Sequence, residues 1–79
     1  MGSQPDVRNH LRRIRRRADL TQEEVADRAG VSRQTIISIE RGRYNPSIGL
    51  ALTLAEVLGV PVEEMFEIDR GGSRAQVQP

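Results

Sequence analysis

The residues best suited to specific recognition lie in the stretch 29–43, AGVSRQTIISIERGR. At helical spacing, one face of this stretch is aliphatic and suits burial against a core. The opposite face carries Arg33, Gln34, Ile37 and Ser38. A face that serves only solubility does not need this mixture of hydrogen-bonding and apolar side chains. We therefore ask what this second face contacts.

Catalytic and metal-binding chemistry find little support in the rest of the 79 residues. The chain has no cysteine and one histidine, His10, which excludes a histidine-based metal cluster and makes histidine-dependent catalysis unexpected. No glycine-rich phosphate loop and no paired nucleophile and base are present. We therefore expect no enzyme activity, no cofactor and no bound metal.

The net charge of +1 conceals an uneven distribution. Residues 1–45 hold ten arginines against six acidic residues, a balance of +4, and residues 46–79 hold two against five, a balance of −3. Such polarity suits one surface for a polyanion and another for a different partner, although a solvated charged surface gives the same counts. All twelve basic residues are arginines, which suit bidentate contacts with phosphates and guanines.

Composition divides the chain into three parts. Residues 1–5 are predicted as a flexible leader, 6–69 as one folded domain and 70–79, RGGSRAQVQP, as a disordered tail. No apolar run approaches the roughly 20 residues needed to span a bilayer, and no apolar signal region precedes the domain. With the lack of cysteine, these features predict a cytoplasmic location.

Local start and stop signals predict a helical domain without strands. Val7, Leu11 and Ile14 are spaced for one buried face of a first helix. Serine or threonine side chains cap the next three helices, glycines end them, and a proline begins the last. The predicted helices cover 6–17, 21–29, 32–41, 47–58 and a final segment from 61.

These helices define an all-α domain of five helices around an aliphatic core. The fourth helix also carries Leu50, Leu52 and Val57, which belong either to the core or to a dimer contact. The predicted core consists of Leu11, Ile14, Leu20, Val25, Ala26, Ala29, Val31, Ile36, Ile39, Ile48, Ala51, Leu54, Ala55, Leu58, Val62, Met65 and Phe66.

The minimal turn AGVS between the second and third helices describes a helix-turn-helix, although a generic helical hairpin shares this pattern. The segment LTQEEVADRAGVSRQTIISIERGRYNPS resembles the Cro/cI-type (lambda-repressor-like, XRE) family of helix-turn-helix transcriptional regulators. With LALTLAEVLGVPVEEMF after it, the chain resembles the compact single-domain bacterial and archaeal members over residues 8–67. Ile37 departs from the family, whose members commonly carry a small or polar residue there.

The resemblance implies that the third helix enters the major groove of double-stranded DNA. It implies base contacts by Ser32, Arg33, Gln34, Ile37 and Ser38. Arg33 suits guanine, Gln34 suits adenine and Ile37 suits a thymine methyl group. For Ile37, partial burial is an equal alternative.

Phosphate contacts are expected beside the recognition helix. The resemblance places Gln22 on the DNA backbone at the start of the second helix, where free N–H groups favour a phosphate. Arg43, Tyr44 and Asn45 follow the third helix and are expected to contact phosphates, while packing of Tyr44 against the domain is equally open. In the run RRIRRR, Arg12, Arg13, Arg16 and Arg17 are expected to be solvated, with one or two near DNA.

The resemblance also implies a partly buried structural ion pair between Arg15 and Glu40. As a whole, it implies a sequence-specific transcriptional regulator, a repressor or autoregulator, that binds an inverted repeat as a homodimer with half-sites about 34 Å apart. The alternative is an antitoxin-like or adaptor module that uses the same fold to bind a protein partner, such as a toxin or another regulator.

Overall fold

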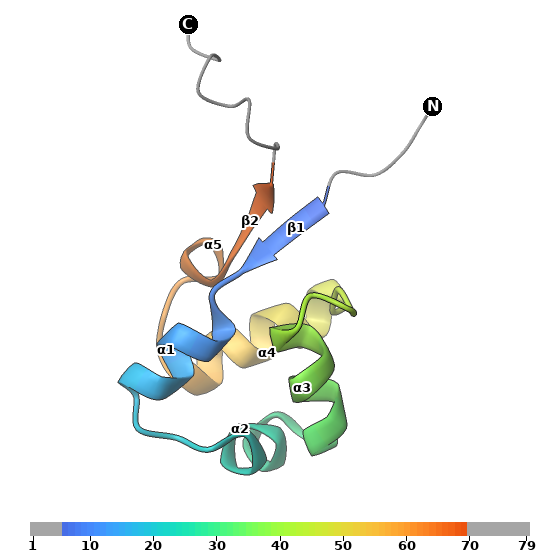
Figure 1. Ribbon diagram of the computed structural model, residues 1–79. Helices are drawn as coiled ribbons and strands as arrows, with labels where there is room; N and C mark the ends of the chain where they lie inside the picture. Colours follow the sequence, from blue (N-terminus) through green and yellow to red (C-terminus); the bar gives the residue numbers. More distant parts are fainter. Residues whose placement is uncertain (1–5, 70–79) are drawn as a thin grey trace, which may run out of the picture.

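The computed structural model describes residues 6–69 and shows five short helices with a two-stranded ribbon that extends from them (Figure 1). The predicted leader and the predicted tail lie outside the described residues. The five helices were expected, but the ribbon corrects the all-α prediction to a mainly helical fold. In chain order the elements are β1 (Asp6–Asn9), α1 (Leu11–Arg17), α2 (Gln22–Ala29), α3 (Arg33–Glu40), α4 (Ile48–Leu58), α5 (Val62–Met65) and β2 (Phe66–Asp69).

The ribbon replaces the first turn of the predicted helix 6–17. β1 pairs with β2 in antiparallel register, with Val7 opposite Ile68 and Asn9 opposite Phe66. The spacing of Val7 to later apolar residues suited a helix, but backbone pairing with a distant strand prevails. The side chain of Asn9 then accepts a hydrogen bond from the N–H of Leu11 at 3.2 Å, so α1 begins at Leu11.

The predicted helix caps are present. Thr21 Oγ1 accepts from the N–H of Glu24 at 3.0 Å, and a Glu24 carboxylate oxygen accepts from the N–H of Thr21 at 2.8 Å. These bonds to Thr21 hold the pKa of Glu24 below its usual value. Ser32 caps α3 and Ser47 caps α4 in the same way, each through a 3.1 Å bond to a backbone N–H.

Most of the predicted core is buried or packs against the buried residues. Ala51 and Val62 are half-buried outside this cluster, and Ile48 departs most from the prediction, because it is 78% exposed. It is the first residue of α4, and the inward-facing positions of that helix are taken by Leu50 and Leu54. Pro61 also precedes α5 as its N-cap instead of beginning it. The buried core residues are Leu11, Ile14, Val25, Ala26, Ile36, Ile39, Leu54, Ala55 and Met65.

Candidate nucleic-acid interface

A tight turn fixes α3 against α2. Gly30 ends α2 with a left-handed φ of 76°, a conformation that glycine adopts without steric cost. The N–H of Val31 then donates to the carbonyl of Ala26 at 3.0 Å. Ile36 and Ile39 of α3 are fully buried in the core. The inner face of α3 is therefore anchored, and its outer face is directed away from the domain.

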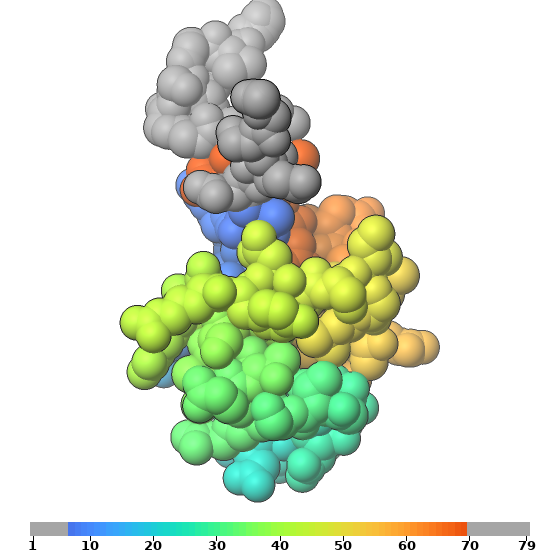
Figure 2. Space-filling view, turned by 90° about the vertical axis from the view of Figure 1, so that its right-hand side faces the viewer, coloured from blue at the N-terminus to red at the C-terminus, as the bar shows by residue number. Residues whose placement is uncertain are grey.

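The outer face of α3 is accessible to a ligand. Ser32, Arg33 and Gln34 are exposed, whereas Ile37 and Ser38 are half-buried. Helical spacing places the last four of these residues on one side of α3. In Figure 2 the green surface of α3 lies between the teal surface of α2 and the yellow-green surface of the loop that follows α3. All five predicted base-contacting residues thus have atoms at the surface.

The loop after α3 borders this face. A hollow of about 280 Å³ is lined by three of the predicted base-contacting residues, by Thr35, and by Arg43 and Tyr44. The Tyr44 side chain lies against this hollow and remains 45% exposed. Asn45 is exposed but does not line this hollow. Two of the three predicted phosphate contacts in this loop are therefore brought beside the outer face of α3.

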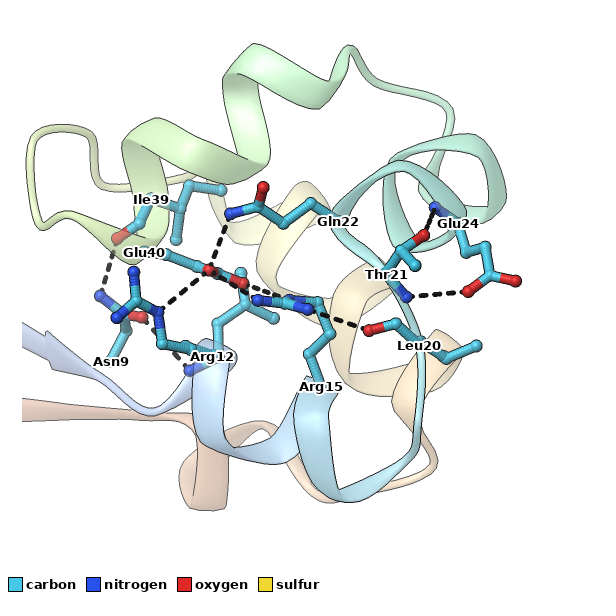
Figure 3. A network of polar contacts seen from close by, with 10 residues as sticks. Asn9, Arg12, Arg15, Leu20, Thr21, Gln22, Glu24, Ile39 and Glu40 are labelled. Carbon is cyan, nitrogen blue, oxygen red and sulfur yellow. Dashed lines mark hydrogen bonds and ion pairs between the residues drawn. The ribbon is translucent and has the colours of Figure 1, made fainter.

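The carboxylate of Glu40, at the end of α3, lies at the centre of a polar network (Figure 3). Arg15 donates to both of its oxygens, from Nε to Oε2 at 2.7 Å and from Nη2 to Oε1 at 3.2 Å. Gln22 Nε2 donates to Oε1 at 3.1 Å, and Arg12 Nε lies 3.6 Å from the same oxygen. We call these four residues the Glu40 network; it joins α1, α2 and α3 through one side chain.

The ion pair between Arg15 and Glu40, at the centre of the Glu40 network, is removed from solvent. The Glu40 side chain is fully buried and Arg15 is 8% exposed. Burial raises the pKa of Glu40, but hydrogen bonds from Arg15 and Gln22 and the charges of Arg15 and Arg12 lower it more. The net result is a pKa below the ordinary value, so Glu40 is ionised at neutral pH. Arg15 also donates to the carbonyl of Leu20 at 2.9 Å, which ties the α1–α2 loop to the pair.

Gln22 makes a hydrogen bond that the sequence did not indicate. It was predicted to bind a phosphate, and in the structure one N–H of its amide is engaged by Glu40. An amide nitrogen carries two hydrogens, so one donor remains available. Gln22 also lines a hollow of about 540 Å³ together with Arg16 and Arg33. Its position is therefore compatible with both roles.

Sequence reasoning missed Asn9 as part of this region. Asn9 Nδ2 donates to the carbonyl of Ile39 at 2.8 Å, which holds the last turn of α3 against the end of β1 (Figure 3). Asparagine is a common residue just before a helix, and at position 9 it indicates a helix start later than the predicted residue 6. Nothing in the sequence indicated that its amide group would bind α3.

The described residues 6–69 contain neither a membrane-spanning helix nor a metal-binding cluster. None of their helices is long and apolar enough to cross a membrane. The same residues contain no group of three or more histidine, cysteine, aspartate or glutamate side chains that would hold a metal ion.

Two short helices at a tight turn, with the second exposed on its outer face, form a helix-turn-helix. Residues 11–65 match the helix-turn-helix family model, and the chain belongs to the Cro/cI-type family of helix-turn-helix transcriptional regulators. This membership confirms the prediction of a DNA-binding regulator, and the family and its relatives are not enzymes.

The relatives extend along most of the chain. An uncharacterized HTH-type transcriptional regulator of Methanothermobacter thermautotrophicus is 46% identical over 86% of this chain and 100% of that protein. The regulator MJ0272 of Methanocaldococcus jannaschii is 48% identical over 76% of this chain and 91% of that protein. Among solved structures, the restriction-modification controller protein C.AhdI from Aeromonas hydrophila is similar with a TM-score of 0.66. It is 35% identical, and the similarity covers 68% of this chain and 82% of that one.

Proposed function

We propose that the protein is a cytoplasmic repressor or autoregulator that binds an inverted-repeat operator as a homodimer. The observation that carries this proposal is the outer face of α3. It combines hydrogen-bonding and apolar side chains at the surface, while its inner face is fixed by the core and by the Glu40 network. A rigidly held helix with such a face suits direct contact with bases in the major groove.

Each residue of this face has a proposed role. Arg33 donates to a guanine and Gln34 pairs with an adenine, and a good bidentate contact provides about 1–3 kcal/mol of discrimination. Ile37 packs against a thymine methyl group with the part of its side chain that remains exposed. Ser32 and Ser38 contact neighbouring base edges at the two ends of the face.

Backbone contacts are proposed on both sides of α3. Gln22 donates its remaining N–H to one phosphate, and Arg43, Tyr44 and Asn45 bind another. Since neutralised phosphates release counterions, affinity should fall steeply as salt concentration rises. An affinity that does not change with salt would contradict these assignments.

The dimer contact is proposed on the exposed side of α4. Ile48 is 78% exposed and Leu52, one turn later, is 52% exposed. The helix carries no charge before Glu56, so a twofold contact between two copies brings no like charges together there. Leu50, in contrast, is partly buried against the core, so this proposal does not use it as a dimer contact.

Selection from a random duplex DNA pool tests this function, with the wild type and Arg33→Ala run in parallel. The wild type should enrich an inverted repeat, and the variant should lose preference at one position in each half-site. Absence of any enriched sequence would refute operator binding. It would favour the alternative that this fold binds a protein partner in this chain.

A further inference from the structure

A positively charged surface lies at the C-terminal end of α3. There the start of α1 and the end of α3 enclose a hollow of about 690 Å³, at the junction with β1. Four arginines from α1, from the end of α3 and from the loop after α3 line it, and we call this surface the arginine hollow. It consists of Arg12, Arg13, Arg41 and Arg43.

Three of the four charges of the arginine hollow are not neutralised by the described part of the chain. Arg13, Arg41 and Arg43 are exposed, and no ion pair joins any of them to a carboxylate within residues 6–69. Glu40 is the single acidic residue that lines the hollow, and its fully buried carboxylate is engaged by Arg15 and lies 3.6 Å from Arg12. The three remaining guanidinium groups repel one another, and an anion relieves that repulsion.

The position of the arginine hollow connects it to the outer face of α3. Arg43 lines both this hollow and the smaller hollow beside Gln34 and Ser38. An anion bound here would therefore lie next to a ligand held against α3. DNA in the major-groove arrangement carries such an anion, because each wall of the groove is a row of phosphates.

We propose that the arginine hollow binds a phosphate group of the DNA backbone next to the bases that face α3. The planar guanidinium groups present paired donors that match phosphate oxygens. This inference rests on the proposed operator binding and adds Arg12, Arg13 and Arg41 to the residues that contact DNA. It also assigns a function to the first part of the RRIRRR run.

The test compares two double variants that carry the same change in charge. Arg13→Gln/Arg41→Gln removes two exposed arginines of the hollow and leaves the Glu40 network intact. Arg17→Gln/Arg28→Gln is the matched control, since both arginines are exposed and neither lines the arginine hollow or the two hollows beside α3. Thermal unfolding of both variants checks that each retains the fold.

The measured quantity is the dissociation constant for the selected operator at several salt concentrations. For the hollow variant, the slope of log affinity against log salt should become shallower by about 0.9 for each phosphate that the protein no longer neutralises. The control variant should keep the wild-type slope. Equal slope changes in the two variants would overturn the proposal, because they would reflect net charge alone.

A neutral methylphosphonate placed at single operator positions identifies the phosphate. The wild type should lose affinity at one position per half-site where the hollow variant loses none. If the wild type selects no operator, the proposed function fails, and the same salt comparison on generic duplex DNA still tests the hollow. If an operator is selected but both variants follow the wild-type slope, the arginine hollow alone is refuted.

Discussion

Replacing Glu40 by alanine should destabilise this domain more than any other single change of an acidic residue in its described part. The variant leaves Arg15 buried at 8% exposure without its carboxylate and deprives Gln22 of its acceptor. Removing one partner of a buried ion pair costs about 3–5 kcal/mol. A domain of 79 residues has a free energy of unfolding of about 4–12 kcal/mol, so the loss is a large fraction of the total.

Thermal unfolding followed by circular dichroism measures this loss. Each 1 kcal/mol lowers the midpoint of a domain of this size by about 4–8 °C, so Glu40→Ala should lower it by at least about 12 °C. Glu24→Ala is the comparison, because it also removes an ionised glutamate with hydrogen bonds, but one exposed at a helix cap. Its midpoint should fall clearly less.

The double variant Arg15→Ala/Glu40→Ala measures the coupling energy between these two side chains. It removes the uncompensated charge as well as the carboxylate, so it should be more stable than the sum of the two single losses predicts. Equal destabilisation by Glu40→Ala and Glu24→Ala would refute the reasoning. If the stability losses of the two single variants add up to that of the double variant, the reasoning is also refuted, because two side chains that form an ion pair must show a coupling energy.

Three further outcomes are expected. Because the folded state lowers the pKa of Glu40, its carboxylate stabilises the domain above the ordinary value of 4.5, and this contribution is lost as pH falls through 4.5 toward the folded pKa. Midpoints measured against pH should therefore fall less steeply below about 4.5 for Glu40→Gln than for the wild type. Ile48→Ser/Leu52→Ser should weaken self-association by about 100-fold or more in sedimentation experiments, without unfolding the monomer; an unchanged dissociation constant would place the dimer contact elsewhere. Asn9→Ala removes hydrogen bonds to Ile39 and to the start of α1, and should cost about 1–3 kcal/mol in urea unfolding; a loss within error would show that this residue does not hold α3.

The helices were predictable because their signals are local. Thr21, Ser32 and Ser47 mark helix starts within three residues of the groups they cap, so a short window of sequence contains the whole interaction. The ribbon was not predictable in this way. Its pairing joins Val7 to Ile68 across the entire domain, and each strand of four residues is too short for a pattern that alternates clearly.

The error at Ile48 has a different cause. α4 is apolar on nearly all sides, so helical spacing allows more than one inward face. The face through Leu50 and Leu54 packs on the core, and Ile48 is left exposed. The choice between the faces is made by packing of α4 against the core, which involves residues distant in the sequence.

The outward side of α3 could be predicted from the sequence because its signals, like those of the helices, are local. The turn and the cap of α3 are local, and together they determine which side of that helix faces outward. What the sequence did not indicate is how the orientation of α3 is secured. Asn9 binds the carbonyl of Ile39 and Arg12 approaches Glu40, and both contacts cross about thirty residues of chain.

The Glu40 network links the stability of the domain to its proposed contacts with DNA. Glu40 closes α3, and the same carboxylate orients the amide of Gln22 at the start of α2. With one N–H of that amide held by Glu40, the direction of the remaining N–H is fixed before any phosphate arrives. Arg12, whose Nε lies near the same oxygen of Glu40 as the Gln22 amide, belongs to the arginine hollow. One buried carboxylate at the end of α3 therefore holds two of the residues that we propose as phosphate contacts, Gln22 and Arg12.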